Sequence, residues 1–111
     1  MRKKVFTAKV LIDGTGNPPT KDPYIVVEEG IIQEVGSGRP PESLVESAEL
    51  IEMPTASIIP GIIDSHVHLA LGRAIPQSGE PDKDAARLAL WAAKNARVAL
   101  TAGVTTVGDC G

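Results

Sequence analysis

The 111-residue sequence predicts an α/β protein in two parts, an all-β unit over residues 1–59 and a strand–helix–strand unit over residues 60–111. Before residue 60, short runs of β-branched and apolar residues are separated by turn-forming residues, which indicates strands. After it, an alanine-rich stretch of helical length lies between two further β-rich runs. That order is typical of two parallel strands joined by a crossover helix. The composition changes at Pro60.

The first expected strand covers residues 5–12, and turn formers rich in glycine and proline follow it. Two more strands, residues 24–28 and 31–35, are joined through Glu29 and Gly30. Glycine readily adopts the positive φ that a tight hairpin turn needs, so this sequence predicts a hairpin.

The last β-rich runs of the first part are residues 50–53 and 58–59. We expect two short extended pieces on either side of Pro54, because proline belongs at the edges or ends of strands. The whole first part, residues 1–59, is therefore expected to be all-β.

The second part begins with an expected strand over residues 62–69, followed by a loop over residues 70–81 that is rich in glycine and proline. Asp82 or Asp84 can then cap a helix. A short carboxylate accepts hydrogen bonds from the free N–H groups of the first turn and suits the positive end of the helix dipole.

The helix is expected to reach about Ala102, with Gly103 just beyond its end and a second strand over residues 104–107. One face of the helix carries side chains at steps of three and four residues. These residues are Leu88, Trp91, Asn95, Val98 and Ala102. Trp91 is most simply an anchor of the core.

Charge and composition exclude several classes of function. The net charge is -3 with a pI near 5.3, and only Arg2-Lys3-Lys4 forms a basic cluster, so we expect no nucleic-acid partner. No apolar run is long enough to span a membrane, and Lys9 and Asp13 interrupt any signal-peptide core. The single cysteine, Cys110, excludes an intrachain disulfide framework and fits a reducing compartment. We therefore expect a cytoplasmic protein.

His66 and His68 are the only histidines, and they lie two residues apart on an expected strand. Alternate side chains leave the same face of a strand, so both imidazoles can reach one ion, with Asp64 two residues further back. Neutral imidazole binds zinc well, but catalytic zinc sites usually have three protein ligands and water. Because an isolated H-x-H pair also occurs by chance, the pair alone leaves a structural role open.

The sequence around these histidines resembles a known pattern. Residues 60–68, Pro-Gly-Ile-Ile-Asp-Ser-His-Val-His, resemble the P-G-[hydrophobic]-I-D-x-H-x-H segment that opens the barrel in the amidohydrolase superfamily. Residues 10–16 and 25–32 resemble the first strands and hairpin of the β-sandwich domain beside such barrels. Residues 102–111 are similar to the second barrel strand of the imidazolonepropionase-like and Xaa-Pro dipeptidase-like branch, which commonly reads G-V-T-T-V-R-D. Gly108 stands where that arginine is common.

The resemblance implies the start of a (β/α)8 TIM barrel, preceded by a β-sandwich-like unit. At 111 residues the chain is too short for the closed barrel, which takes about 250 residues, so we expect an N-terminal portion only. The resemblance also implies that His66 and His68 bind a divalent metal, most often zinc, with one or two ions in the full-length enzyme. Such a metal polarises a substrate carbonyl and lowers the pKa of its water. The other ligands and the proton shuttle would lie beyond Gly111, so we expect no catalytic residue within the chain.

Five further residues have two interpretations each. We expect Asp64 to orient a ligand or neighbouring backbone from outside the first coordination shell, while a plain structural hydrogen bond is equally open. A structural role is the better prediction for Asp109. Cys110 is not expected to be a nucleophile, because no free base is available to activate its thiol. Arg73 or Gln77 could contact substrate, although solvated loop residues are the default.

The leading functional hypothesis is hydrolysis of a carbon–nitrogen bond, other than a protein peptide bond, in a small cyclic amide, N-acyl amino acid or dipeptide. The partners expected are this small-molecule substrate and, for the full-length protein, further copies of itself. The alternatives are a non-catalytic scaffold homologue and an inactive fragment. We expect the isolated chain to be inactive and to self-associate, because an open sheet edge and an uncovered apolar face remain.

Overall fold

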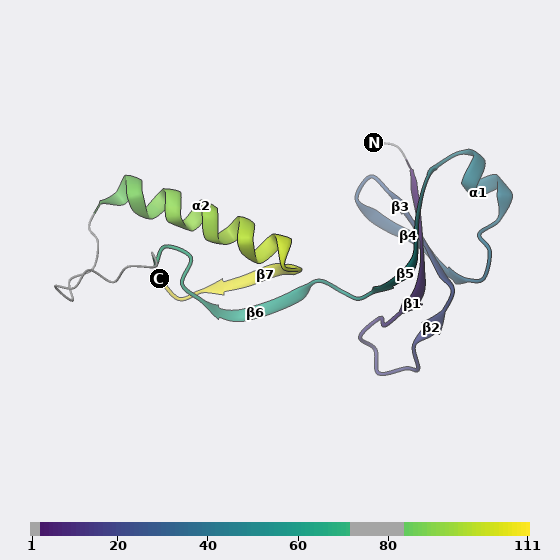
Figure 1. Cartoon of the computed structure of the whole chain (residues 1–111), viewed down its shortest axis with the longest axis horizontal. Helices are drawn as coiled ribbons and strands as arrows, with labels where there is room; N and C mark the ends of the chain where they lie inside the picture. The colour runs from purple at the N-terminus through teal and green to yellow at the C-terminus, as the bar shows by residue number, and fades with distance from the viewer. Residues whose placement is uncertain (1–2, 72–83) are drawn as a thin grey trace. The chain divides into compact units, whose positions relative to one another are not determined.

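The computed structural model describes residues 3–71 and 84–111 and contains two compact units (Figure 1). The first unit ends at Pro60, and the second begins at Gly61. In the described parts of the chain, no helix is long and apolar enough to cross a bilayer.

The first unit is built on one five-stranded sheet. Its strands are β1 (Lys4–Leu11), β2 (Thr20–Lys21), β3 (Pro23–Glu28), β4 (Ile31–Ser37) and β5 (Glu49–Ile58). Along one edge, β1 pairs antiparallel with β2 and then with β3. Only Asp22, with a φ of 47°, separates β2 from β3 in the sequence. Along its other edge, β1 pairs parallel with β5. The hairpin predicted around Gly30 is confirmed: Glu29 and Gly30 both have positive φ, as a two-residue turn between β3 and β4 requires.

The first unit is mostly β, as expected, but the expectation that it is all-β is wrong. Its described strands lie in a single sheet, and a short helix, α1 (Glu42–Glu46), follows Pro41. The sequence did not predict this helix because five residues are too few to display a helical period. The helix α1 forms because it packs against the core of the first unit. Leu44 within α1, and Ala48 just after it, pack against the core cluster of Val5, Tyr24 and Val26.

Tyr24 joins the core of the first unit to its polar surface. Its hydroxyl donates a 2.6 Å hydrogen bond to the Glu34 carboxylate on the neighbouring strand. This hydrogen bond, together with burial and the negative charge of Glu34, raises the pKa of Tyr24 above 10.0. The ring lies over Gly36, where a Cβ atom would overlap it. A glycine at this place in β4 therefore makes room for the aromatic ring.

The fifth strand is continuous through Pro54, whereas the sequence predicted two separate pieces. The step from Met53 to Ser57 lies opposite the shorter step from Ala8 to Val10, so the extra residues of β5 bulge out of the ladder at Pro54. A bulge needs no donor from proline, which explains why the strand tolerates it.

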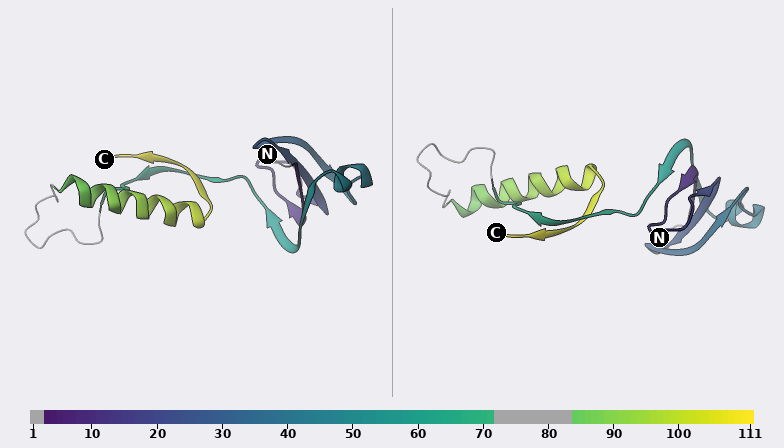
Figure 2. Two further views of the ribbon diagram at one scale, coloured as in Figure 1. Left: turned by 90° about the horizontal axis from the view of Figure 1, so that it is seen from above. Right: turned by 90° about the horizontal axis from the view of Figure 1, so that it is seen from below.

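The second unit consists of β6 (Ile62–Val67), α2 (Ala85–Thr101) and β7 (Val104–Asp109). The two strands pair in parallel, as the sequence predicted, and Figure 2 shows α2 running along one side of the pair. The Asp84 side chain accepts hydrogen bonds from two backbone N–H groups of the first turn, and Gly103 follows the helix with a φ of +93°. Both caps confirm the prediction for Asp84 and Gly103. Asp82, the alternative cap, lies outside the described residues.

The face that α2 turns to the strands differs partly from the predicted one. Leu88, Trp91 and Asn95 are half-buried, as expected, but Val98 is 58% exposed and Ala102 is also exposed. Two alanines, Ala92 and Ala99, are half-buried in their place. Residues 88, 92, 95 and 99 are spaced close to the 3.6 residues of one helical turn, so they stay on one face of the helix. The predicted row, which ends at residues 98 and 102, has a shorter mean spacing and therefore turns away from the strands. Trp91 is not fully buried, and the Lys94 ammonium lies 4.8 Å from the centre of its ring.

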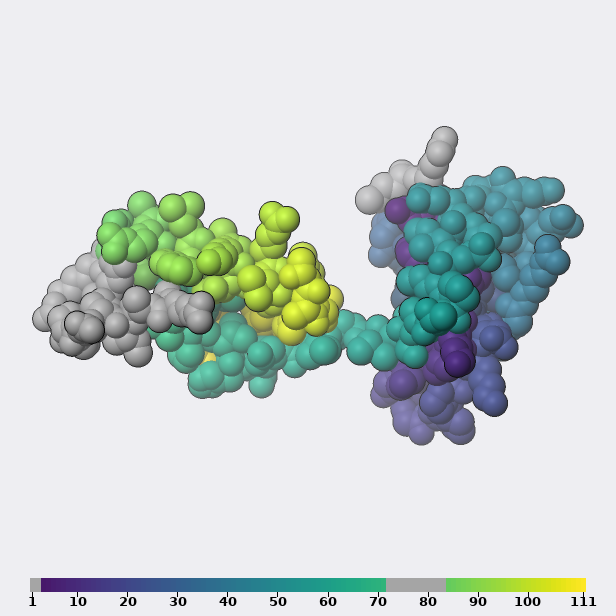
Figure 3. Space-filling view, viewed as in Figure 1, coloured from purple at the N-terminus to yellow at the C-terminus, as the bar shows by residue number. Residues whose placement is uncertain are grey.

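Apolar side chains remain at the surface of the second unit. Ile62 and Ile63 in β6 are 48% and 72% exposed, and no residue of that strand is fully buried. Figure 3 shows α2, green to yellow, at the surface of the second unit. Leu90 and Leu100 of this helix are 74% and 62% exposed. The described residues thus leave apolar area open on both the strands and the helix.

Candidate metal centre

The two histidines lie side by side at the carboxyl end of β6. His66 is within the strand and His68 directly follows it, and both residues are exposed. Their ring centroids are 5.1 Å apart, with the ring planes inclined at 78°. Two imidazoles this close, at the end of a strand, form a pair of donors of the kind that zinc binds in proteins.

A β-bulge shapes the strand at the first histidine. Asp64 pairs with Val107 and Val67 with Asp109, so three steps along β6 match two along β7, and Ser65 and His66 contain the extra residue. Within this bulge, the His66 backbone N–H donates to the Asp64 side-chain oxygen at 3.2 Å. The Asp64 carboxylate therefore holds the backbone of a candidate ligand.

The second histidine is held through its ring. Nδ1 of His68 lies 2.7 Å from the backbone oxygen of Gly111. A carbonyl oxygen can only accept a hydrogen bond, so the hydrogen-bond network assigns the proton to Nδ1. The lone pair of Nε2 is then free to bind a metal, which is how the second hydrogen bond of a ligand histidine usually fixes its tautomer.

The residues that follow β7 close a turn beside His68. The Asp109 side-chain oxygen accepts a 3.1 Å hydrogen bond from the Gly111 N–H, and the Cys110 N–H donates to Val67 O at 2.9 Å. The Cys110 thiol is exposed and lies 3.8 Å from Gly108 O, which is a weak polar contact. This turn therefore binds the end of β7 to the end of β6 through backbone groups.

Sequence reasoning missed two parts of this arrangement. Asn95 donates from its side-chain amide to Leu69 O at 2.8 Å and to Leu71 O at 3.2 Å, so α2 holds the segment that follows His68. The sequence did indicate this residue, because Asn95 is the one amide side chain in an otherwise apolar row of the helix. Gly108 is the other part, because a Cβ atom there would lie 2.7 Å from Ser65 O. Its signal was a glycine inside a strand, which often marks close approach of another backbone.

The donors present fit part of a metal site. In residues 3–71 and 84–111, no group of three or more histidine, cysteine, aspartate or glutamate side chains comes together for an ion. The two imidazoles supply two of the three protein ligands that a catalytic zinc usually has. Arg73 and Gln77, the expected substrate contacts, lie outside the described residues.

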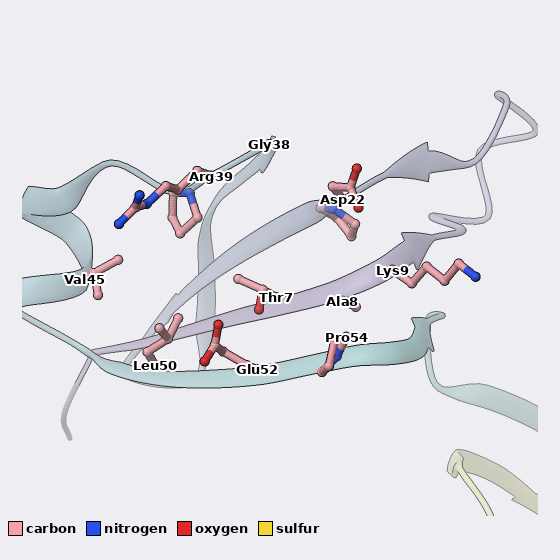
Figure 4. A pocket seen from close by; sticks show the side chains of 12 residues that line it. Thr7, Ala8, Lys9, Asp22, Gly38, Arg39, Val45, Leu50, Glu52 and Pro54 are labelled. Atoms are coloured by element: carbon pink, nitrogen blue, oxygen red, sulfur yellow. The ribbon is translucent and has the colours of Figure 1, made fainter.

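A separate hollow of about 510 Å³ opens on the first unit, between the sheet and α1 (Figure 4). Charged side chains of both signs line it, namely Lys9, Arg39, Asp22 and Glu52. None of its lining residues is a histidine or a cysteine. It therefore offers oxygen ligands and cations, but no imidazole or thiolate chemistry.

Comparisons with known proteins match the chain to the beginning of larger enzymes. No model of a protein family matches it. Imidazolonepropionase of Treponema denticola is 50% identical over 50 residues, which are 44% of this chain and 12% of the relative. Imidazolonepropionase of Streptococcus pyogenes serotype M1 is 40% identical over 53 residues, 47% of this chain and 13% of the relative. The match thus spans only about an eighth of these relatives.

Solved structures resemble nearly the whole chain. A Xaa-Pro dipeptidase with methionine in its active site gives a TM-score of 0.79 at 27% identity, covering 95% of this chain and 25% of that one. A crystal structure of an amidohydrolase gives 0.72 at 28% identity, covering 95% of this chain and 24% of that one. A molinate hydrolase gives 0.69 at 26% identity, with 96% and 23% coverage.

The relatives in sequence and in structure are of one class, the hydrolases, and the fold of the chain resembles a part of these larger proteins. The chain belongs to the amidohydrolase superfamily and corresponds to the N-terminal portion of its members.

Proposed function

We propose that the full gene product is a metal-dependent hydrolase of carbon–nitrogen bonds and that His66 and His68 are two of its metal ligands. The observation that supports this most directly is the pair of imidazoles 5.1 Å apart at the carboxyl end of β6. In parallel α/β architecture, working sites lie at the carboxyl ends of the strands. The residues from Pro60 onward would be the first strand, helix and second strand of a (β/α)8 barrel, and residues 1–59 would lie outside it.

The proposed substrate is a small cyclic amide, an N-acyl amino acid or a dipeptide. This substrate class is supported by the similar proteins: the relatives in sequence include imidazolonepropionases, and one similar solved structure is a Xaa-Pro dipeptidase. We further propose a cytoplasmic homo-oligomer, from the single cysteine and the open apolar surfaces of the second unit.

A divalent cation, most simply zinc, would supply Lewis acidity that polarises a carbonyl and lowers the pKa of water. The chain's own residues prepare its ligands. His68 presents Nε2 because Nδ1 donates to Gly111 O, and Asp64 fixes the backbone of His66. Asp109 bonds the Gly111 N–H, which gives it a structural role and leaves proton transfer to residues outside this chain.

Metal analysis of the full gene product tests the proposal. We expect zinc in the wild-type protein and a clearly lower content in His66→Ala and in His68→Ala. Ser65→Ala is the matched control, because Ser65 is exposed in the same bulge and carries no ring. Equal metal content in all four proteins would contradict the proposal. Metal-dependent turnover of a panel of cyclic amides, N-acyl amino acids and dipeptides would then identify the substrate class.

A second candidate, an inactive fragment or non-catalytic scaffold homologue, is supported by one observation. The described residues contain no third ligand beside the histidine pair. The sequence encoded after Gly111 separates the candidates: a reading frame that continues with further histidines, a lysine or glutamate and an aspartate at strand ends favours the enzyme. The isolated chain is expected to show no turnover in either case.

A further inference from the structure

We propose that Asp109 is a positioning residue for His68 and acts through the backbone of Gly111. The inference rests on the proposed function where it concerns metal binding. Its first consequence, the tautomer of His68, can be measured without a metal.

Two consecutive hydrogen bonds carry the proposal. The Gly111 N–H donates to the Asp109 side chain at 3.1 Å, and Gly111 O accepts from His68 Nδ1 at 2.7 Å. The same glycine is therefore bonded on its amide side to one residue and on its carbonyl side to the other. A change at Asp109 reaches the imidazole through this single residue.

Gly111 requires such support because its backbone is permissive. Its φ is +93°, a region that glycine enters freely, and it has no side chain to restrict it. The bond to Asp109 holds its amide, while the neighbouring Cys110 N–H is held by Val67 O at 2.9 Å. Together these bonds hold the peptide group that precedes Gly111, and the Gly111 oxygen is the acceptor that lies beside Nδ1 of His68.

A comparison with Asp64 strengthens the assignment. Asp64 and Asp109 each accept a hydrogen bond from the backbone N–H two residues further along the chain. The first bond holds His66 directly, and the second holds the partner of His68. Each histidine of the pair is thus supported by one aspartate, once on the same strand and once from the neighbouring strand.

Three variants of the full gene product test the role of Asp109. Asp109→Ala removes the acceptor, Asp109→Asn keeps a side-chain oxygen at the same place, and Asp109→Ser offers a weaker, shorter acceptor. The readouts are the ¹⁵N NMR signature of the His68 ring in metal-free protein, assigned with His68→Ala, and the affinity for Zn²⁺. Amide exchange of β6 and β7 shows whether each variant keeps the strand pair.

In wild-type protein we expect the proton on Nδ1 of His68. Asp109→Ala should yield a mixture with the Nε2–H tautomer and should weaken Zn²⁺ binding about ten- to a hundredfold. Asp109→Asn should stay close to wild type, with Asp109→Ser between the two. If Asp109→Ala does not fold, the other two variants decide: Asp109→Asn should keep more of the Nδ1–H tautomer and bind Zn²⁺ more tightly than Asp109→Ser.

Two outcomes would overturn the proposal. One is an unchanged His68 tautomer in folded Asp109→Ala or Asp109→Ser. The other is an equal loss in Asp109→Asn and Asp109→Ala, because that result would show that the negative charge, and not the hydrogen bond to Gly111, is what matters. A wild-type protein that binds no Zn²⁺ would instead contradict the proposed function, and the tautomer measurement would still test this inference.

Discussion

Replacing Gly108 by alanine should push β6 and β7 apart at the bulge that contains His66. A Cβ atom on Gly108 would lie 2.7 Å from Ser65 O and 3.1 Å from Ser65 C. Ordinary contact between such atoms begins near 3.5 Å, so the strands must separate by roughly 0.8 Å. The obstacle is backbone, which cannot rotate out of the way as a side chain can.

The expected penalty is that of overpacking, about 1–3 kcal/mol. It should appear as easier local opening of the strand pair. The Cys110 N–H, bonded to Val67 O, is a suitable probe because it bridges the two strands just beyond Gly108. With RT near 0.6 kcal/mol, this penalty corresponds to exchange that is about 5- to 150-fold faster.

Native-state hydrogen exchange of the full gene product measures this effect, with Thr106→Val as the control. Thr106 is exposed on the same strand, and valine keeps its size and its preference for β structure. Exchange of the Cys110 amide at the wild-type rate in Gly108→Ala would show that the close approach has no energetic consequence. Gly108→Arg, with the residue common in related strands, should open the pair at least as much.

Three further predictions concern the scaffold. Asp84→Ala removes the acceptor of the first turn of α2 and should destabilise the helix by about 0.5–2 kcal/mol, seen as faster exchange of its first amides; unchanged exchange would refute the capping role. Asn95→Ala leaves Leu69 O without its 2.8 Å partner and should weaken Zn²⁺ binding, whereas Lys94→Ala on the outer surface should not. Glu34→Ala should lower the pKa of Tyr24 towards 10.0 in an ultraviolet titration. Because the folded-state pKa is raised, the stability linked to Tyr24 is complete below pH 10 and is lost as the pH rises through the folded value; an unmoved titration would contradict this.

The sequence predicted those features of the fold that depend on local chemistry. Gly30 marked the hairpin, Asp84 marked the start of α2, and the strand–helix–strand order marked the parallel pair. The failures have a different origin. Whether Pro54 divides a strand depends on its partner β1, and whether five residues form α1 depends on the core beneath them.

The candidate site divides in the same way. The spacing of His66 and His68 is local, so sequence alone placed the two rings together. The partner of His68 is Gly111, 43 residues later, and the contact between Gly108 and Ser65 likewise depends on the register of β6 against β7. No periodicity in the sequence specifies that register, which includes two irregular steps.

The long sequence separation between His68 and Gly111 has a consequence for biosynthesis. A growing polypeptide leaves the ribosome from its N-terminus, so β6 emerges well before the turn that follows β7. Until Gly111 has been added and β7 has docked, the ring of His68 has no carbonyl to select its tautomer. If His68 binds a metal ion as proposed, capture of the ion in its final geometry would follow assembly of the strand pair.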